Sequence, residues 1–429
     1  MVRTSCCVVG GGPDGMVLGL LLARCGVEVT VLEKHGDFLR DFRGDTVHPT
    51  TLSLLDELGL GEQFAALPQR RVQQVQFPLG PDGQFVTLGD FTQLRVRHNY
   101  IAMVPQWDFL NLLADAGAQE PTFTLRMDTE ATSFIRERGR INGVQYRTSQ
   151  SETGEIRAPI TVACDGRSSI ARAIPELRVQ DFSAPMDVWW FRLPRHPEDP
   201  AGVVPTMRNG MFVLLIDRGD YFQAAAIIAK GTDAARRAEP IAQFNQLLVE
   251  QMPWLAGREL LGDWQELKLL DVRLDRMRRW HVPGLLCIGD AAHAMSPVGG
   301  IGINLAVQDA VAAARYLAPP LRRGRITRAA VAAVQRRRWA TTVLIQRFQR
   351  MAHARVVQPA LAGEIDTSTT ASLPLALRAA NRVPWIRGIP PYLLAYGALQ
   401  ERPPRAALGS RDRAGSDASR MNAARERVR

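Results

Sequence analysis

Three short apolar runs, each followed at once by glycine or by Asp-Gly, dominate the pattern of hydrophobic and polar positions. They cover residues 6–9, 160–164 and 285–288, and their length and composition are typical of buried parallel strands. After the first and third runs the apolar spacing becomes helical, over residues 16–25 and from residue 303 onward. The pattern therefore predicts an α/β fold built from strand–turn–helix units.

A different pattern occupies residues 176–270, where loops rich in proline separate the periodic segments. Three strand-like runs and one helical stretch lie there, at residues 188–191, 211–216, 221–228 and 240–252. We expect an antiparallel sheet that roofs a pocket, with Trp190, Met211 and Tyr221 as candidate substrate-binding residues. Such residues in strands are more often simply core, so both interpretations stay open.

The other segments alternate between the two periodicities. Strands or hairpins are predicted at residues 72–98, 122–125, 131–137 and 141–148, and helices at residues 51–60, 108–116, 326–356, 371–380 and 392–399. From about residue 401 the chain is rich in Ser, Gly, Arg and Ala without periodicity. We therefore expect a disordered tail over residues 401–429.

Length and composition favour a globular protein with two lobes, because 429 residues exceed one average domain and 46% are hydrophobic. No apolar run reaches 18 residues, and strand-like residues begin at Ser5, so we expect a soluble, cytoplasmic protein without a signal peptide. The five cysteines lie in apolar runs without metal-ligand spacing. We interpret them as reduced core residues and expect neither disulfides nor zinc.

The net charge of +10 is concentrated at one end of the chain. The last 109 residues hold 21 Arg, no Lys and 6 acidic residues, a net charge of +15. A basic half can bind nucleic acid or anionic lipid, but these arginines punctuate apolar helical sequence instead of forming a patch with aromatic residues. We favour solvated helix faces and expect no nucleic-acid partner.

The first glycine-rich turn is typical of dinucleotide binding. Gly10, Gly12 and Gly15 satisfy the spacing G-x-G-x-x-G between a strand and an apolar helix, the context that this motif requires. A second strand ends in Glu33, which is placed to accept hydrogen bonds from the ribose hydroxyls of an adenine dinucleotide. The alternative is a surface acid at the end of a strand.

The stretch at residues 285–310 carries a second glycine-rich site. A strand breaks at Gly289-Asp290, and after Pro297 come Gly300, Gly302 and Asn304 at the start of a helix. Such a loop directs backbone N–H groups and a positive helix end to one place. A flat, electron-rich ring that gains negative charge, such as a reduced flavin, would be held well there. A strand-loop-helix unit without a ligand would not need so many glycines.

These residues resemble the second FAD-contacting motif of the single-component FAD-dependent aromatic hydroxylases. The resemblance implies that Asp290 bonds the ribityl chain, that Pro297 lies over the flavin where oxygen reacts, and that the backbone from Gly300 to Asn304 holds the pyrimidine end of the ring. Ile301 departs from the family, in which Gln is frequent, but the backbone makes the contact there.

The same resemblance assigns further residues. It implies that Arg43 lies beside the flavin and its pyrophosphate, that Gln106 lies against the ribityl chain, and that Asp165 and Gly166 form the Asp-Gly motif that serves FAD and, transiently, the pyridine nucleotide. Asp45 and His48 have no fixed counterpart in the family. His48 is either an active-site base, for which an ordinary pKa near 6.5 is suitable, or only a helix-entry residue. Asp45 is a second candidate base.

The implied fold is a discontinuous Rossmann-like FAD-binding domain with an inserted antiparallel β-sheet substrate domain and C-terminal helices. The boundaries that we predict are residues 1–75, 99–175 and 271–325 for the FAD domain, 76–98 and 176–270 for the substrate domain, 326–400 for the helices and 401–429 for the tail. The implied activity is that of a monooxygenase. NAD(P)H reduces FAD, and a flavin C4a-hydroperoxide passes one oxygen atom to an aromatic or polyketide-like small molecule by hydroxylation or epoxidation.

Three alternatives remain open at this point. An FAD-dependent reductase or dehydrogenase of a prenyl or alkene substrate has much the same dinucleotide motifs. A flavin-dependent halogenase should carry Trp-x-Trp-x-Ile-Pro, and this chain has Trp189-Trp190-Phe191-Arg192-Leu193-Pro194 instead. A basic protein without enzymatic activity would bind DNA or membrane and have no flavin. The oligomeric state stays open, and no stable membrane insertion is expected.

Overall fold

A computed structural model of the chain describes residues 1–39, 46–79, 84–94, 96–208, 210–364 and 400–408. Arg43 and Asp45, named above as candidate site residues, lie outside the described residues. So do the helices predicted at residues 371–380 and 392–399 and the last part of the tail, residues 409–429.

A six-stranded sheet forms the base of the molecule, in the order β21-β22-β13-β2-β3-β9. Five of its strands are parallel, and β21 pairs antiparallel with β22 at one edge. The strands are β2 (Cys6–Val9), β3 (Val29–Leu32), β9 (Phe123–Arg126), β13 (Thr161–Ala163), β21 (His281–Val282) and β22 (Leu285–Cys287). Every residue of β2, β3, β13 and β22 is buried, which explains why these strands appear in the sequence as continuous apolar runs.

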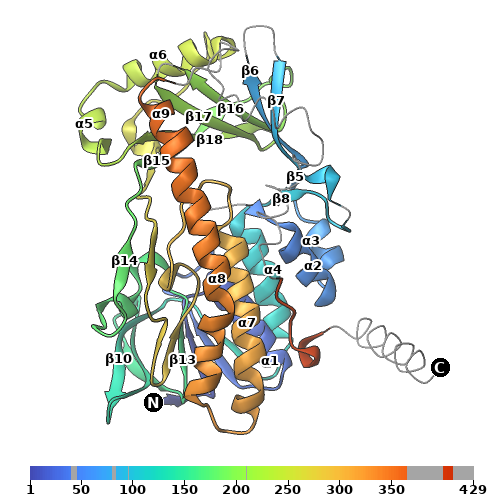
Figure 1. The fold of residues 1–429 in the computed structure, drawn as a ribbon, viewed down its shortest axis with the longest axis vertical. Coiled ribbons are helices and arrows are strands. Elements are labelled where there is room, and N and C mark those ends of the chain that lie inside the picture. The colour runs from blue at the N-terminus through green and yellow to red at the C-terminus, as the bar shows by residue number, and fades with distance from the viewer. Residues whose placement is uncertain (40–45, 80–83, 95, 209, 365–399, 409–429) are drawn as a thin grey trace, which may run out of the picture.

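Four helices pack together beside this sheet, as Figure 1 shows. They are α1 (Pro13–Arg24), α4 (Gln106–Ala118), α7 (Gly302–Arg322) and α8 (Arg328–Ala352). Because α1 follows β2 and α7 follows the loop after β22, the predicted strand–turn–helix units are confirmed. A smaller sheet in the order β1-β12-β11-β10 lies near the same end of the molecule, made of β1 (Val2–Arg3), β10 (Thr129–Glu137), β11 (Arg140–Thr148) and β12 (Thr153–Arg157). The β10–β11 hairpin is confirmed, whereas β12 had not been predicted.

A five-stranded antiparallel sheet forms the other end, in the order β16-β17-β18-β15-β19 (Figure 1). Its strands are β15 (Met186–Pro194), β16 (Val203–Arg208), β17 (Met211–Asp217), β18 (Tyr221–Ala229) and β19 (Lys268–Leu270), with α5 (Asp233–Arg237) and α6 (Ile241–Gln251) beside them. One face packs against Phe244 and Leu248 of α6. The other face packs against Val298 in the loop before α7 and against Val357 in the π-helical turn after α8. The predicted antiparallel sheet, called the roof below, is therefore confirmed.

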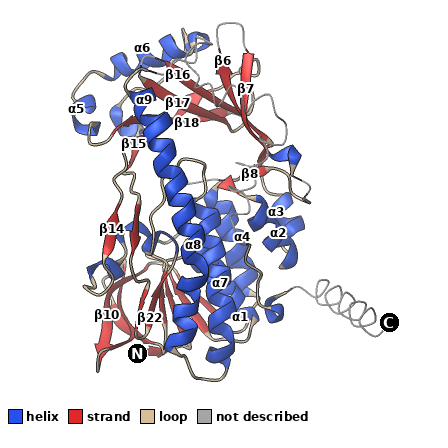
Figure 2. Ribbon diagram, viewed as in Figure 1, coloured by secondary structure: helices blue, strands red, loops and turns tan. Residues whose placement is uncertain are grey.

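Short elements connect the two ends. They are β4 (Thr46–Val47), α2 (Pro49–Glu57), α3 (Gly61–Ala65), β5 (Arg70–Val72), β6 (Gln74–Leu79), β7 (Gln84–Asp90), β8 (Ile101–Met103), β14 (Val179–Asp181) and β20 (Asp275–Met277). The hairpin β6–β7 packs beside β16, as predicted for the roof. Figure 2 shows how the helix α8 extends from the lower strands to the upper sheet. There it continues through a π-helical turn at His353–Val357 into α9 (Gln358–Leu361), which packs against β17.

The tail that we expected to be disordered from residue 401 is packed over residues 401–408. Glu401 is 4% exposed, and its carboxylate lies 2.7 Å from Arg337 Nε and 3.4 Å from Arg338 Nη1. Arg338 is fully buried and also contacts Asp309 at 2.7 Å. Both expectations are therefore wrong at these positions: Arg338 is not on a solvated helix face, and Glu401 is not in a disordered segment. A buried charge needs a partner, and composition does not reveal such a pairing.

The five cysteines are buried and form no disulfide. Burial raises the thiol pKa of Cys7 to about 12, so this residue has no thiolate character at neutral pH. Within the described ranges, no helix is both long and apolar enough to cross a membrane.

Candidate active site

Four of the predicted site segments begin where neighbouring parallel strands end. The strands are in register, with Val9 of β2 opposite both Ala163 of β13 and Leu32 of β3, and with Ala163 opposite Cys287 of β22. The next residues along each strand are the glycine turn, the Asp165-Gly166 pair, Glu33 and the Gly289-Asp290 pair. Ligands of open α/β sheets bind outside the carboxyl ends of the strands, and the structure brings these segments together at that edge.

The glycines of the first turn meet different requirements. Gly10 has φ +105°, and a Cβ on Gly15 would lie 1.9 Å from the carbonyl oxygen of Gly10. The protein's own backbone therefore excludes a side chain at Gly15. A Cβ on Gly12 would meet only Asp14 Oδ1, at 3.4 Å, which is ordinary contact. Packing alone does not require glycine at position 12, but a ligand approaching the backbone at the start of α1 would.

Glu33 lies over this turn. Its Oε2 accepts a hydrogen bond from Gly11 N at 3.1 Å, and its Oε1 accepts one from His35 N at 3.2 Å. Each carboxylate oxygen has lone-pair capacity beyond one such bond, so Glu33 can still accept from ribose hydroxyls. Gln106 is the first residue of α4, a helix that packs against α1, and its side chain is half-buried.

Asp165 has one carboxylate oxygen that is buried and available to a ligand. Its Oδ2 accepts a hydrogen bond from Ile170 N at 3.0 Å, but its Oδ1 is buried without a partner in the part of the chain that the structure describes. Burial raises the pKa of Asp165. An unsatisfied buried acceptor costs about 1 to 3 kcal/mol, so a donor from a ligand would stabilise this arrangement. Gly166 follows in the left-handed region with φ +76°.

Two arginines fix the backbone and the side chain of Asp290. Arg172 forms a bidentate pair with Asp275 at 2.8 and 2.9 Å and also donates to the Asp290 carbonyl oxygen at 2.8 Å. Arg167 approaches the Asp290 carboxylate only to 3.9 Å. The Asp290 side chain is 37% exposed, and one long ion pair leaves most of its acceptor capacity available to hydroxyl groups.

The loop from Pro297 to Gly302 is held by the segment that enters α2. The Gly300 carbonyl oxygen accepts hydrogen bonds from Thr46 Oγ1 at 2.7 Å and from His48 Nε2 at 3.0 Å. Thr50 Oγ1 and Thr51 Oγ1 both donate to Asn304 Oδ1, at 2.5 and 3.0 Å. The start of α7 is thereby tied to the start of α2. Gly302 has an open environment, since a Cβ there would come no closer than 4.0 Å to Met295.

His48 lies where the sequence placed it, beside the glycine loop, but its environment opposes the role of a general base. The ring is fully buried, and burial lowers the pKa of His48 to about 4, against the opposing effect of the Gly300 carbonyl. A base that works near pH 7 needs a pKa close to that value. Because Nε2 donates to Gly300, the neutral ring presents Nδ1 as an acceptor, and Nδ1 is buried without a partner among the described residues.

Asp14 is a neighbour of this site that sequence reasoning missed. It is 6% exposed at the start of α1, and its Oδ2 would lie 2.3 Å from a Cβ on Gly289, so it fills the space between the two glycine motifs. Burial, together with Asp290, raises the pKa of Asp14 well above its usual value. Its position inside the G-x-G-x-x-G motif was a signal that could have identified it.

Helix α8 supplies a second group that sequence reasoning missed. The group consists of four buried residues, three on α8 and one directly after it: Arg338, Gln346, Gln349 and His353. Arg338 contacts Asp309, whereas Gln349 and His353 contact Ser296. Gln346 Nε2 donates to the carbonyl oxygens of Asp275 and Ala294. Their spacing of three, four or eight residues places them on one face of the helix. A search for apolar residues at helical spacing does not detect this face, because its residues are polar.

The roof contributes residues according to strand alternation. Trp190 packs with Val298 and Leu214 on the face toward the loop, and its indole Nε1 is buried without a described partner. Met211 lies on the opposite face with Phe244, so its assignment to the pocket is wrong, and its neighbour Phe212 faces the loop side instead. Tyr221 shares the face of Trp190 but stands at the end of β18, where it stacks on the exposed Arg192 at 4.8 Å.

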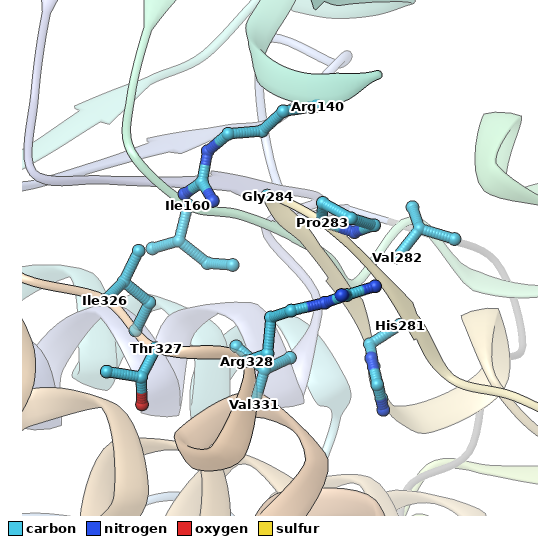
Figure 3. A pocket seen from close by; sticks show the side chains of 10 residues that line it. All are labelled: Arg140, Ile160, His281, Val282, Pro283, Gly284, Ile326, Thr327, Arg328 and Val331. Atoms are coloured by element: carbon cyan, nitrogen blue, oxygen red, sulfur yellow. The ribbon is translucent and has the colours of Figure 1, made fainter. Parts of the chain in front are cut away.

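One small surface pocket lies elsewhere. Figure 3 shows that Arg140, Gly284, His281 and Arg328 line it. Ile160 and Gly284, which also border it, precede β13 and β22, so the pocket lies at the amino ends of the parallel strands. It is therefore on the opposite edge from Asp165 and Asp290 and does not belong to the candidate site.

The arrangement fits an adenine dinucleotide that carries a flat ring. The glycine turn and helix α1 suit its diphosphate, Glu33 its ribose, and the carboxylates of Asp165 and Asp290 its hydroxyl groups. The buried acceptors Asp165 Oδ1 and His48 Nδ1 are both without described partners, as expected if a ligand supplies the donors.

Comparisons with known proteins agree with this geometry. The model of the FAD binding domain family matches residues 3–347. The chain is 31% identical over 398 residues to a 6-methylpretetramide 4-monooxygenase of Streptomyces rimosus, and the match covers 90% of this chain and 91% of that protein. Among solved structures, the anhydrotetracycline hydroxylase OxyS of Streptomyces rimosus superposes with a TM-score of 0.72 at 23% identity, covering 94% of this chain and 77% of that one. The flavin-dependent brominase Bmp2 has a TM-score of 0.73 at 15% identity, covering 93% and 95%, which shows a shared fold.

Proposed function

The chain belongs to the FAD-binding domain family of flavoprotein monooxygenases, and we propose that it hydroxylates a polycyclic aromatic, polyketide-like small molecule. It is an enzyme with FAD as cofactor and NAD(P)H as electron donor. The observation that carries the proposal is the meeting of three features at one loop: the strand-end carboxylates, the Gly300–Asn304 segment, and the aromatic face of the roof around Trp190.

FAD supplies the chemistry: when it is bound and reduced, it activates molecular oxygen for transfer to the substrate. The protein's contribution is to hold this cofactor and to exclude water. Gly10, Gly12 and the start of α1 would bind its diphosphate, Glu33 its ribose, and Asp165 and Asp290 its ribityl hydroxyls. Gln106 and Gly166 are proposed as further contacts, and so is Arg43, which lies outside the described residues.

The ring end of the cofactor would lie against the backbone of Gly300 and Gly302, with Pro297 over its reacting face. Backbone N–H groups at the start of α7, together with the positive end of this 21-residue helix, stabilise negative charge on a reduced ring. His48 contributes as a neutral ring: Nε2 fixes Gly300, and Nδ1 accepts a hydrogen bond from the cofactor or the substrate. If the substrate is a phenol, a group other than His48 has to accept its proton. Asp45, which lies outside the described residues, remains the second candidate base.

The substrate would bind between Pro297 and the roof. Trp190, Leu214 and Ala225 form one row across β15, β17 and β18 on the face toward the loop. They offer an apolar surface that suits fused aromatic rings, and the indole N–H of Trp190 can donate to a ring oxygen of the substrate. The relative at 31% identity is named for a substrate of this kind, 6-methylpretetramide. We propose a cytoplasmic location, where NAD(P)H is supplied.

The test is a panel of fused-ring phenolic polyketides that includes 6-methylpretetramide, offered to the purified protein with FAD and either NADH or NADPH. We expect nicotinamide oxidation to be stimulated by at least one member and to yield a hydroxylated product. Stimulation only by non-aromatic alkenes, with a product that gains hydrogen or loses it without gaining oxygen, would support the reductase or dehydrogenase instead.

A further inference from the structure

The residues on either side of Pro297 are held by one side chain of α8. Gln349 Nε2 donates to the Ser296 carbonyl oxygen at 2.8 Å and to the Val298 carbonyl oxygen at 3.0 Å. Gln349 Oε1 accepts a hydrogen bond from Ser296 N at 3.2 Å. The amide thus pairs with the Ser296 backbone as a neighbouring strand would, and it reaches across Pro297 to the next carbonyl. All of this takes place in a buried environment, since Gln349 is 0% exposed.

The neighbouring turns of α8 hold the rest of the same segment. Gln346 Nε2 donates to the Ala294 carbonyl oxygen at 3.3 Å, and His353 Nε2 lies 2.8 Å from Ser296 Oγ. His353 begins the π-helical turn, a local irregularity that is frequent at functional sites. The end of α8 and the turn after it therefore hold the segment at residues 294–298 at several points, in addition to the hydrogen bonds that join Ala294 to Asp275.

A buried amide in the last turn of a helix needs a reason. Burying Gln without its hydrogen bonds is costly, and Leu or Met would fill similar space at a high helix propensity. Among the described residues, all three hydrogen bonds of the Gln349 amide go to the backbone beside Pro297 and none to α8 itself. These hydrogen bonds fix the backbone on both sides of Pro297, which an apolar side chain that only fills the core could not do.

We propose that Gln349 is a positioning residue that sets the distance between Pro297 and the flavin ring. The inference rests on the proposed function, because Pro297 has this task only if FAD binds below it. Without the amide, the loop gains alternative positions, and only a fraction of molecules presents the conformation that accepts the ring. The apparent dissociation constant for FAD then equals the intrinsic constant divided by that fraction, so binding is weaker.

The test compares Gln349→Met with a matched control on the same helix. Gln335 makes the same kind of contact, because its Oε1 accepts from Trp280 N at 3.1 Å and its Nε2 donates to the Arg278 carbonyl oxygen at 3.0 Å. Arg278 and Trp280 lie between β20 and β21. The Trp280 ring packs on His293, with ring centroids 4.8 Å apart, but the Gln335 amide itself makes no hydrogen bond to residues 294–298 among those described. Gln335→Met therefore removes a similar set of hydrogen bonds without touching the segment around Pro297.

Apoprotein of the wild type and of both variants is titrated with FAD, and the visible absorption spectrum of the bound flavin is recorded. We expect Gln349→Met to raise the FAD dissociation constant about tenfold and to shift the flavin spectrum, the order of effect expected when a set of buried hydrogen bonds is lost. Gln335→Met should lower the melting temperature and leave both flavin readouts at the wild-type value. In turnover, Gln349→Met should divert more reducing equivalents into hydrogen peroxide.

The outcomes distinguish a failure of the proposed function from a failure of the positioning role of Gln349. Wild-type protein that binds no FAD would overturn the proposed function. Wild-type protein that binds FAD, with Gln349→Met and Gln335→Met indistinguishable in affinity and spectrum, would overturn the positioning role alone. If Gln349→Met does not accumulate as folded protein, Gln349→Glu takes its place. It keeps the shape and the acceptor for Ser296 N but, held protonated by burial, can donate to only one of the two carbonyl oxygens, so unchanged FAD affinity in this variant would also overturn the proposal.

Discussion

The parallel sheet and the five-stranded roof meet at the loop around Pro297, but they contribute to the site in different ways. On the side of the parallel sheet, the groups that hold the cofactor are backbone atoms and strand-end carboxylates, and their positions follow from register between β2, β3, β13 and β22. On the side of the roof, the contribution depends on which side chains face the loop. Adjacent residues such as Met211 and Phe212 lie on opposite faces there.

Because of this difference, the parallel-sheet side and the roof should respond differently to substitutions. A backbone site tolerates little at its glycines, because a Cβ collides either with the protein's own backbone, as at Gly15, or with the ligand that approaches, as at Gly12. A side-chain face tolerates substitution if the size is kept, and its changes alter recognition more than folding. The predictions below test this contrast, from the largest expected effect to the smallest.

The same substitution at two glycines of the first turn should have opposite consequences. Gly15→Val places a Cβ 1.9 Å from the Gly10 carbonyl oxygen, so we expect no folded protein. Gly12→Val meets only Asp14 Oδ1 at 3.4 Å from its Cβ, so the apoprotein should fold and should lose FAD affinity by more than about 1 to 3 kcal/mol through collision with the diphosphate. Thermal unfolding of the apoproteins and FAD titration measure both effects. Equal stability of the two variants would show that the turn is not packed as described.

Truncation should distinguish the packed part of the tail from the rest. Deleting residues 401–429 removes Glu401 from the fully buried Arg338, and breaking such a buried pair costs about 3 to 5 kcal/mol. Arg338 also pairs with Asp309, which in turn pairs with His293 beside Asp290, so the loss of Glu401 should also affect that segment. Burial alone would raise the pKa of Asp309, but His293 and Arg338 lower it. Deleting residues 409–429 is the control and should leave the melting temperature nearly unchanged. Two truncations with the same melting temperature would contradict the role of Glu401.

His48 should make the stability of the flavin side depend on pH. Its pKa in the folded protein is about 4, below the ordinary value of 6.5, so the folded state disfavours the charged ring. The stabilisation is complete above pH 6.5 and is lost as the pH falls toward 4, by about 3 kcal/mol for this shift. His48→Gln, which stays neutral, should flatten the dependence of apoprotein unfolding on pH in that range. An unchanged slope would mean that His48 is not buried as described.

Two adjacent tryptophans provide the smallest and most specific test. Trp190 faces the loop, whereas Trp189 is fully buried on the α6 side and donates to Asp233 Oδ1 at 2.6 Å. Trp190→Phe should raise the KM for the aromatic substrate by about fivefold, the loss of one hydrogen bond of roughly 1 kcal/mol, with little change in melting temperature. Trp189→Phe should lower the melting temperature and leave KM unchanged. The reverse pattern would show that the faces of the roof are assigned wrongly.

The sequence predicted the parallel-sheet side well because glycine spacing and apolar runs have local causes. The first turn, Glu33, the Asp165-Gly166 pair and the Gly289-Asp290 break all lie at strand ends, as expected from a pattern of strands followed by turns. His48 was placed at the correct loop, but its weak basicity comes from complete burial, which depends on the tertiary fold.

Other parts could not be predicted from the sequence because their causes are not local. The polar face of α8 is buried because Asp309 and Glu401 lie opposite Arg338 and because the Ser296–Val298 backbone lies opposite Gln349. In the sequence, both residues resemble ordinary surface residues. Glu401 pairs with a residue 63 positions away, and a short polar segment gives no indication of that contact. The choice between Met211 and Phe212 depends on strand register, which a one-residue shift would reverse.

The measurement that tests the central claim most directly is the origin of the oxygen in the product. The enzyme, loaded with FAD and supplied with NAD(P)H, is given the most strongly stimulating fused-ring phenol under ¹⁸O₂, and the product is analysed by mass spectrometry. We expect one ¹⁸O atom in each product molecule and no conversion without oxygen. Product without the label, or conversion that continues anaerobically, would contradict the assignment as a monooxygenase.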